Sequence, residues 1–187
     1  LKGSRERELL EKELADQNNR VIDIPLIING KEVRTGITGK ITNPADHNHV
    51  LATYHMATEK EAAMAIDAAL SAKCEWMNLA WMERAAIMAK AAEIISKKYR
   101  FRLNAATMLG QGKNAFQAEI DSACEVIDYL RFNNYFASLI YREQPKSVAE
   151  TINRLEYRPL EGFLYTITPF NFTAIASNLN ASVVLMG

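Results

Sequence analysis

The sequence predicts an α/β protein in which N-terminal helices and a β-ribbon lead into the first strand and helix of a parallel sheet. Residues 163–167 form an almost continuous apolar run with β-branched and aromatic side chains, which is typical of a strand buried on both faces. Pro169 cannot donate a backbone hydrogen bond, so we expect the strand to end before it. Residues 173–185 then suit a helix. Because no second parallel strand follows, we expect the chain to be the amino-terminal part of a larger protein.

Residues 1–57 are predicted to contain a charged helix followed by β-structure. Residues 5–17 suit a short helix with a narrow apolar stripe. The Asn29-Gly30 pair lies between two apolar runs, which predicts a hairpin. Residues 41–56 also have strand character, interrupted by a turn. We expect these strands to form solvent-facing antiparallel ribbons.

Residues 58–147 are predicted to be mainly helical. Thr58 and Glu61 have the spacing of a capping box, which marks the start of the first helix in this segment. Apolar periodicity predicts a second helix over residues 82–99 and an unusually long third helix over residues 115–141. These helices make up most of the predicted core.

The last two predicted segments differ in character. Residues 148–160 alternate well enough between apolar and polar side chains to predict an exposed strand, of the kind that pairs between subunits. Residues 161–187 begin the domain that contains the buried strand and its helix.

Charge and hydropathy exclude several classes of function. The 22 basic residues equal the 22 acidic ones, and no basic cluster is present, so nucleic acid and anionic membranes are not expected partners. No apolar run approaches the ~20 residues that cross a bilayer. The first residues are too charged for a secretory signal and too acidic for a transit peptide.

Cysteine and histidine patterns predict no metal site. Cys74 and Cys124 have no zinc-type or CxxC spacing, so we expect reduced core thiols of an intracellular protein. His47, His49 and His55 lack a carboxylate or thiol partner at a ligand spacing, which favours surface loop histidines.

Two stretches carry a resemblance to a known family. The sequence EGFLYTITPFNFTAI, preceded by GQGKNAFQAEIDSACEVIDYLRFN, resembles the aldehyde dehydrogenase superfamily, and within it the Δ1-pyrroline-5-carboxylate dehydrogenase branch. The similarity extends over about residues 24–187. It implies an aldehyde dehydrogenase-like α/β fold in which residues 161–187 start an NAD-binding parallel sheet.

The resemblance also implies a covalent reaction with NAD as cofactor. In this family a cysteine thiolate attacks a small-molecule aldehyde, a hydride passes to NAD, and water releases the acid. In this branch L-glutamate γ-semialdehyde becomes glutamate during proline catabolism. The family further implies a homodimer or higher homo-oligomer and a location in the mitochondrial matrix.

Five residues match functional positions of the family. Asn171 matches the side-chain amide that stabilises the negative oxygen of the tetrahedral intermediate. Ile167 and Thr168 match positions beside the nicotinamide ribose, although Thr168 is otherwise an ordinary strand end. Phe172 matches a position that lines the aldehyde pocket, and Glu125 matches a carboxylate directed toward the substrate.

These residues also have simpler interpretations. Asn171 could cap the helix that follows it, because asparagine is a favoured N-cap. Asp121, Glu125 and Asp128 fall on one helix face, and such a row is usually solvated. Phe172 could belong to the core.

The family's nucleophilic cysteine, general-base glutamate and NAD-binding lysine lie beyond the matching stretches. Cys124 lies within a predicted helix and is not expected to be the nucleophile. Gly110 and Gly112 follow no strand and lack a third glycine, so they form no dinucleotide fingerprint. We therefore expect this chain alone to be inactive.

Two hypotheses follow from the sequence. In the first, the chain is a segment of an NAD-dependent oxidoreductase. In the second, it is a non-catalytic interaction module whose subunit contacts are residues 5–17 and 148–158. Activity and NAD binding of the short and extended proteins would separate them.

Overall fold

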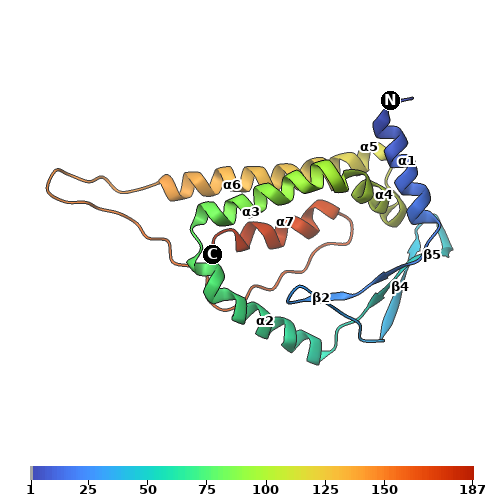
Figure 1. Ribbon diagram of the computed structural model, residues 1–187, viewed down its shortest axis with the longest axis horizontal. Coiled ribbons are helices and arrows are strands. Elements are labelled where there is room, and N and C mark those ends of the chain that lie inside the picture. The colour runs from blue at the N-terminus through green and yellow to red at the C-terminus, as the bar shows by residue number, and fades with distance from the viewer. Residues whose placement is uncertain (1) are drawn as a thin grey trace.

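The computed structural model describes residues 2–187, in which layers of helices lie beside two small β-sheets (Figure 1). Helix α1 (Arg5–Asn18) confirms the first predicted helix, and it packs against α4 (Arg100–Gln111) at one end of the molecule. The buried Gln17 side chain donates a hydrogen bond of 3.0 Å to the Arg102 carbonyl. This contact joins the N-terminal helix to the helical layers.

The predicted Asn29-Gly30 hairpin is confirmed. Strands β2 (Leu26–Ile28) and β3 (Lys31–Val33) pair antiparallel. Asn29 has φ 51° and Gly30 has φ 70°, so both turn residues are left-handed. A two-residue turn of this kind matches the twist of the strands on either side.

The second sheet has the order β1-β5-β4 and corrects one expectation. Strands β4 (Thr38–Asn43) and β5 (Asp46–His55) form the predicted antiparallel ribbon, but β1 (Ile22–Ile24) pairs parallel with β5. The expectation of antiparallel ribbons only is therefore wrong. The chain between β1 and β5 contains a hairpin and β4, and a connection of this length permits parallel pairing.

The helical part of the molecule includes α2, which lies at its edge, and two long paths of consecutive helices (Figure 1). Helix α2 (Glu59–Asn78) begins with the predicted capping box of Thr58 and Glu61. The first path consists of α3 (Trp81–Ile94), the π-helical turn η1 (Ile95–Tyr99) and α4.

The second path follows after a short turn. It consists of α5 (Ala115–Ala118), the π-helical segment η2 (Glu119–Glu125) and α6 (Val126–Arg142), and it confirms the long helix predicted at residues 115–141. Helix α7 (Thr173–Val184) confirms the last predicted helix and packs beside α6.

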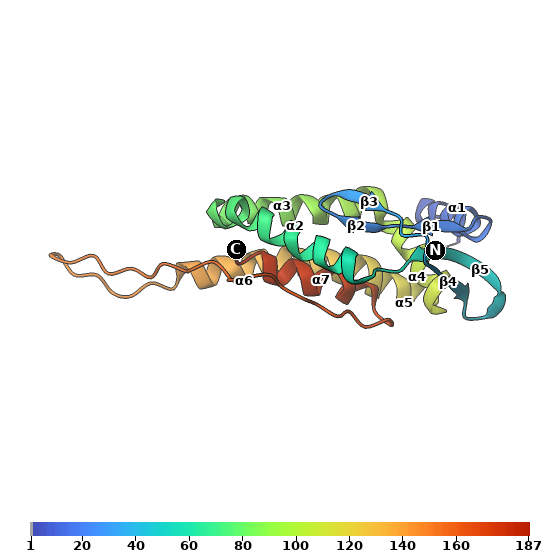
Figure 2. The ribbon, with the colours of Figure 1, turned by 90° about the horizontal axis from the view of Figure 1, so that it is seen from below.

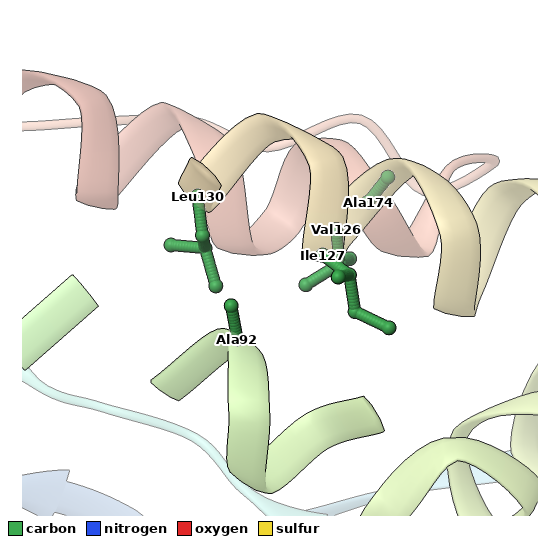
Figure 3. Packing of buried hydrophobic residues seen from close by; sticks show 5 residues of the cluster. All are labelled: Ala92, Val126, Ile127, Leu130 and Ala174. Atoms are coloured by element: carbon green, nitrogen blue, oxygen red, sulfur yellow. The ribbon is translucent and has the colours of Figure 1, made fainter. Parts of the chain in front are cut away.

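The central cluster of buried side chains lies where α3, α6 and α7 meet (Figure 3). Ala92 and Ala174 are fully buried, and their small side chains let the helices approach closely. Val126, Ile127 and Leu130 of α6 lie between them. This packing fixes the position of α7 in the molecule.

The exposed strand predicted at residues 148–160 is not formed. Only an isolated bridge between Val148 and Thr151 is present, and the segment after α6 projects away from the helices (Figure 2). A strand is stabilised by hydrogen bonds to a neighbouring strand, and none lies beside this segment within residues 2–187.

The buried strand predicted at residues 163–167 is also absent from the described chain. Tyr165 is 79% exposed and Ile167 is 75% exposed. The strand is not formed here for the same reason, because no strand among residues 2–187 pairs with this segment. The apolar pattern specifies burial, but residues 2–187 supply no strand or helix that covers these side chains.

The cysteines and histidines differ from their predicted settings. Cys74 and Cys124 are free thiols, as expected, but both are exposed rather than in the core. His47, His49 and His55 lie on β5 rather than in loops. No group of three or more potential metal ligands occurs in the described part of the chain. Among the described helices, none has the length and apolar character to cross a membrane.

Candidate functional site

The start of α7 meets side chains from residues 107–121, a part of the sequence 52 to 66 residues earlier. The chain turns at Phe170 and Asn171, and Phe172 occupies the N-cap position of α7. Phe172 provides no side-chain hydrogen bond to the helix. The free N–H groups of the first turn therefore need an acceptor from elsewhere.

Asp121 of η2 is that acceptor. Its Oδ2 accepts a hydrogen bond from the Thr173 N–H and its Oδ1 accepts one from the Ala174 N–H, each at 3.2 Å. The side chain is only 6% exposed. A carboxylate at this position also interacts favourably with the positive end of the helix dipole. A side chain 52 residues earlier in the sequence thus caps α7.

Lys113 completes the contacts on the other side of Phe172. Its Nζ lies 2.6 Å from Asp121 Oδ2 and donates a hydrogen bond of 2.7 Å to the Asn171 carbonyl. The same ammonium lies 4.6 Å from the centre of the Phe172 ring, within cation–π range. We call Lys113 and Asp121 the lysine–aspartate clamp.

The charge of Asp121 follows from these contacts. Burial by itself would raise the pKa of Asp121, but the Lys113 ammonium and the N–H groups of Ala174 and Thr173 outweigh it and lower the pKa. The carboxylate is therefore ionised at neutral pH, as both the ion pair and the helix cap require.

Helix α4 also holds this turn, through side-chain hydrogen bonds to Thr173. The Thr173 hydroxyl lies 2.7 Å from the hydroxyl of Thr107, and it accepts a hydrogen bond of 3.1 Å from Gln111 Nε2. Thr107 is almost completely buried. The first residue of α7 is thus bound through its backbone by Asp121 and through its side chain by α4.

Asn171 has a fixed backbone and a free side chain. Its carbonyl is bound by Lys113, whereas its amide is exposed and has no hydrogen-bond partner among residues 2–187. The alternative that Asn171 caps α7 is therefore wrong, because Asp121 fills that role. A free amide on a held backbone can donate hydrogen bonds to a bound molecule, and it does not titrate near neutral pH.

The other predicted site residues lie on three different parts of the chain around this turn. Phe172 is adjacent and 41% exposed. Ile167 and Thr168 are exposed on the extended segment that leads to the turn. Glu125 is partly exposed at the end of η2, the segment that also carries Asp121. No hydrogen bond joins Glu125 and Asn171 in the described chain.

Sequence reasoning missed the clamp. Asp121 was assigned to a solvated carboxylate row, but it is 4% exposed and caps another helix. Lys113 and Asp121 are eight residues apart with a helix break between them, so no helical spacing rule relates them. The available signal was that both residues lie in the GQGKNAFQAEID stretch that carries the family resemblance.

Comparison with solved structures gives the class of this fold. The chain superposes with a TM-score of 0.97 and 45% sequence identity on the Δ-pyrroline-5-carboxylate dehydrogenase from Mycobacterium tuberculosis bound with NAD. The match covers 100% of this chain and 35% of that chain. The fold is thus the aldehyde dehydrogenase-type α/β fold, as the sequence predicted.

Sequence comparison gives the family. The model of the aldehyde dehydrogenase family matches residues 33–187, and the chain belongs to that family. It is 54% identical over 167 residues to a probable delta-1-pyrroline-5-carboxylate dehydrogenase of Schizosaccharomyces pombe, a match that covers 89% of this chain and 30% of the relative. It is 46% identical to the mitochondrial delta-1-pyrroline-5-carboxylate dehydrogenase of Dictyostelium discoideum, with 99% of this chain and 33% of the relative covered. The chain spans about a third of the length of these relatives.

Proposed function

We propose that this chain forms one wall of the active site of an NAD-dependent dehydrogenase that oxidises L-glutamate γ-semialdehyde to glutamate in proline catabolism. The names of its relatives support this substrate, which is the open form of Δ1-pyrroline-5-carboxylate. The observation that carries the proposal is the free Asn171 amide on a backbone held by the lysine–aspartate clamp.

In the proposed reaction Asn171 stabilises negative charge. When a nucleophile adds to the aldehyde, the carbonyl oxygen becomes an oxyanion, and the Asn171 amide donates a hydrogen bond to it. A donor of this kind typically lowers the barrier by about 3–4 kcal/mol when it is already oriented. The bound backbone fixes the position from which the Asn171 side chain extends before the substrate binds.

Cys124 does not serve as the nucleophile in this proposal. Desolvation of its thiol, with the nearby Glu119 carboxylate, raises the pKa of Cys124. Its Sγ lies 3.7 Å from Glu119 Oε1. A thiol that holds its proton more tightly is a poorer nucleophile at neutral pH.

Residues 163–168 have the chemistry to contact NAD. Their backbone N–H and C=O groups make no hydrogen bond to the rest of residues 2–187, Thr168 offers a hydroxyl, and Ile167 offers an exposed apolar surface. These groups fit a ribose and the face of a nicotinamide ring. NAD, when bound, supplies the hydride acceptor.

Phe172 and Glu125 are the proposed substrate contacts. Phe172 is partly exposed beside Asn171, so its ring is available to the carbon chain of the aldehyde. Glu125 is partly exposed at the end of η2, and we propose that its carboxylate contacts the substrate.

The assembly and location are also proposals. Val148, Ile152 and Leu155 are 62%, 86% and 54% exposed on the segment that projects after α6, which supports a homodimer or higher homo-oligomer. Relatives named as mitochondrial support a location in the mitochondrial matrix. A monomer by light scattering, or a cytosolic location after fractionation, would contradict the respective proposal.

Replacing Asn171 by alanine tests the function in the longest protein that the gene encodes. We expect kcat for L-glutamate γ-semialdehyde to fall by about 10²–10³-fold, with a much smaller change in KM, because the donor acts mainly on the transition state. Steady-state kinetics with NAD measure both quantities.

The matched control is Asn48→Ala, because Asn48 is an exposed asparagine on β5, away from this turn. An Asn171→Ala protein that retains the kcat of the unmodified protein would refute the catalytic role of Asn171. If even the unmodified protein neither binds NAD nor oxidises the aldehyde, the alternative of a non-catalytic interaction module holds instead.

A further inference from the structure

We infer that Lys113 and Asp121 are positioning residues for Asn171. In this inference the lysine–aspartate clamp determines the position of the Asn171 side-chain amide, which is the proposed oxyanion donor. This inference rests on the proposed function of Asn171 and adds two residues to it. Neither residue needs to touch the substrate. Their effect passes through the backbone on the two sides of Phe172.

The position of Lys113 is set by two helix ends. Gly112, with φ 67°, ends α4 in a left-handed conformation, and its N–H bonds to the Met108 carbonyl. Asn114 caps α5, with its Oδ1 2.9 Å from the Gln117 N–H. Lys113 lies between these two ends, so its backbone has little freedom. The Cα of Lys113, from which the side chain and its ammonium extend, is therefore held in place.

Asp121 is placed with similar rigidity by η2. The π-helical segment holds Asp121 next to the fully buried Ser122, whose Oγ lies 2.6 Å from both the Ala118 carbonyl oxygen and Asn104 Oδ1 and shares its one proton between these acceptors. Segments of this kind occur frequently at functional sites. The carboxylate is thereby directed at the first turn of α7.

The clamp marks a boundary in the backbone. Residues 163–170 make no backbone hydrogen bond to the rest of the described chain. From Asn171 onward the clamp binds the backbone at three polar groups, which are the Asn171 carbonyl and the N–H groups of Thr173 and Ala174. Thr166 makes a side-chain contact with Asn180, but Asn171 is the first residue of this stretch whose backbone is bound, and its partner is Lys113.

The Phe172 ring adds a third contact to the same ammonium. Lys113 therefore binds the carbonyl before Phe172, the ring of Phe172 and the carboxylate that caps the helix after it. Loss of the ammonium releases the Asn171 carbonyl while α7 keeps its carboxylate cap. A misplacement of the donor by about 1 Å can lower the rate by about 10²-fold.

A double-mutant cycle of Lys113 and Asn171 tests the inference in the longest protein that the gene encodes. We expect Lys113→Met to lower kcat by about 10–100-fold with little change in KM or in the NAD dissociation constant. In the Asn171→Ala background the same substitution should lower kcat no further, because the group that it positions is already gone. Lys113→Arg keeps the charge and a donor, and it should recover most of kcat.

The matched control is Lys97→Met, which removes an exposed lysine from the 2.7 Å ion pair with Glu93 on the neighbouring helical path and should leave kcat unchanged. Unchanged kcat in Lys113→Met, or an equal loss in both backgrounds, would overturn the inference. If Lys113→Met does not fold, Lys113→Gln replaces it in the cycle, and the same lack of additivity is required. Should Asn171→Ala alone leave kcat intact, the proposed function fails first, which separates the two claims.

Discussion

Asp121 is a carboxylate that folding removes almost completely from water and surrounds with donors. Its partners are one ammonium and two backbone N–H groups, and all three favour the ionised form. Hydrogen bonds to a charged group are worth more than those between neutral groups. The stability of the turn before α7 should therefore depend on the ionisation of this residue.

The Asp121→Asn variant tests that dependence. We expect the free energy of unfolding to fall by about 3 kcal/mol at neutral pH, because an ion pair is lost and an amide N–H₂ group meets Lys113. The pKa of Asp121 is lowered in the folded chain, so its contribution is present above the unfolded pKa of about 3.9 and is lost as the pH falls through the folded value. The difference in the free energy of unfolding between the unmodified protein and Asp121→Asn should thus be constant near neutral pH and should become smaller in acid.

Urea denaturation of both proteins between neutral pH and pH ~3 measures this difference. Asp67→Asn is the control, because Asp67 is exposed on α2. A difference that does not narrow in acid would show that the carboxylate contributes through shape rather than charge.

Helix α7 is held by charged side chains at both ends. At its C-terminal end the buried Arg84 donates hydrogen bonds to the carbonyls of Leu185 at 3.0 Å and Met186 at 3.4 Å, and to the Tyr141 hydroxyl at 3.1 Å. A carboxylate at the start and a guanidinium at the end both complement the helix dipole. The element that follows Asn171 is therefore fixed along its axis as well as against α6.

Replacing Arg84 should loosen the end of α7. We expect Arg84→Met to lower the free energy of unfolding by about 3 kcal/mol, because the helix-end carbonyls lose their donor in a buried place. Arg84→Lys should recover little of it, since one ammonium cannot reproduce the planar fork of a guanidinium. Urea denaturation measures both variants, with Arg7→Met on the exposed face of α1 as control. Full stability of the lysine variant would contradict the role of the fork.

The elements differed in how far the sequence alone could predict them. The Asn29-Gly30 hairpin, the Thr58 capping box and the helices were predictable because their signals are local in the chain. The clamp was not, because Asp121 caps a helix that begins 52 residues later. Asn171 was identified by family resemblance, whereas the exclusion of its capping role required the geometry of Asp121.

On the scale of the whole molecule, apolar side chains that the sequence marks for burial lie on the surface. Phe170 is 93% exposed, and Tyr165 and Ile167 are nearly as open. The apolar pattern of residues 163–167 predicts a buried strand, but strand formation needs a neighbouring strand. Residues 2–187 contain no neighbouring strand that could pair with this segment.

Hydrogen exchange tests whether residues 163–167 become a strand when more protein surrounds them. In the 187-residue chain we expect the backbone amides of this segment to exchange at nearly unprotected rates, because they have no acceptor. The amides of α7 should exchange slowly in the same sample, which makes that helix the internal control. In the longest protein that the gene encodes, we expect the segment to gain protection comparable to that of α7, because a buried parallel strand bonds on both sides. Fast exchange in both proteins would mean that this apolar run is a surface segment, and the cofactor contacts proposed for Ile167 and Thr168 would lose the rigid support that they need.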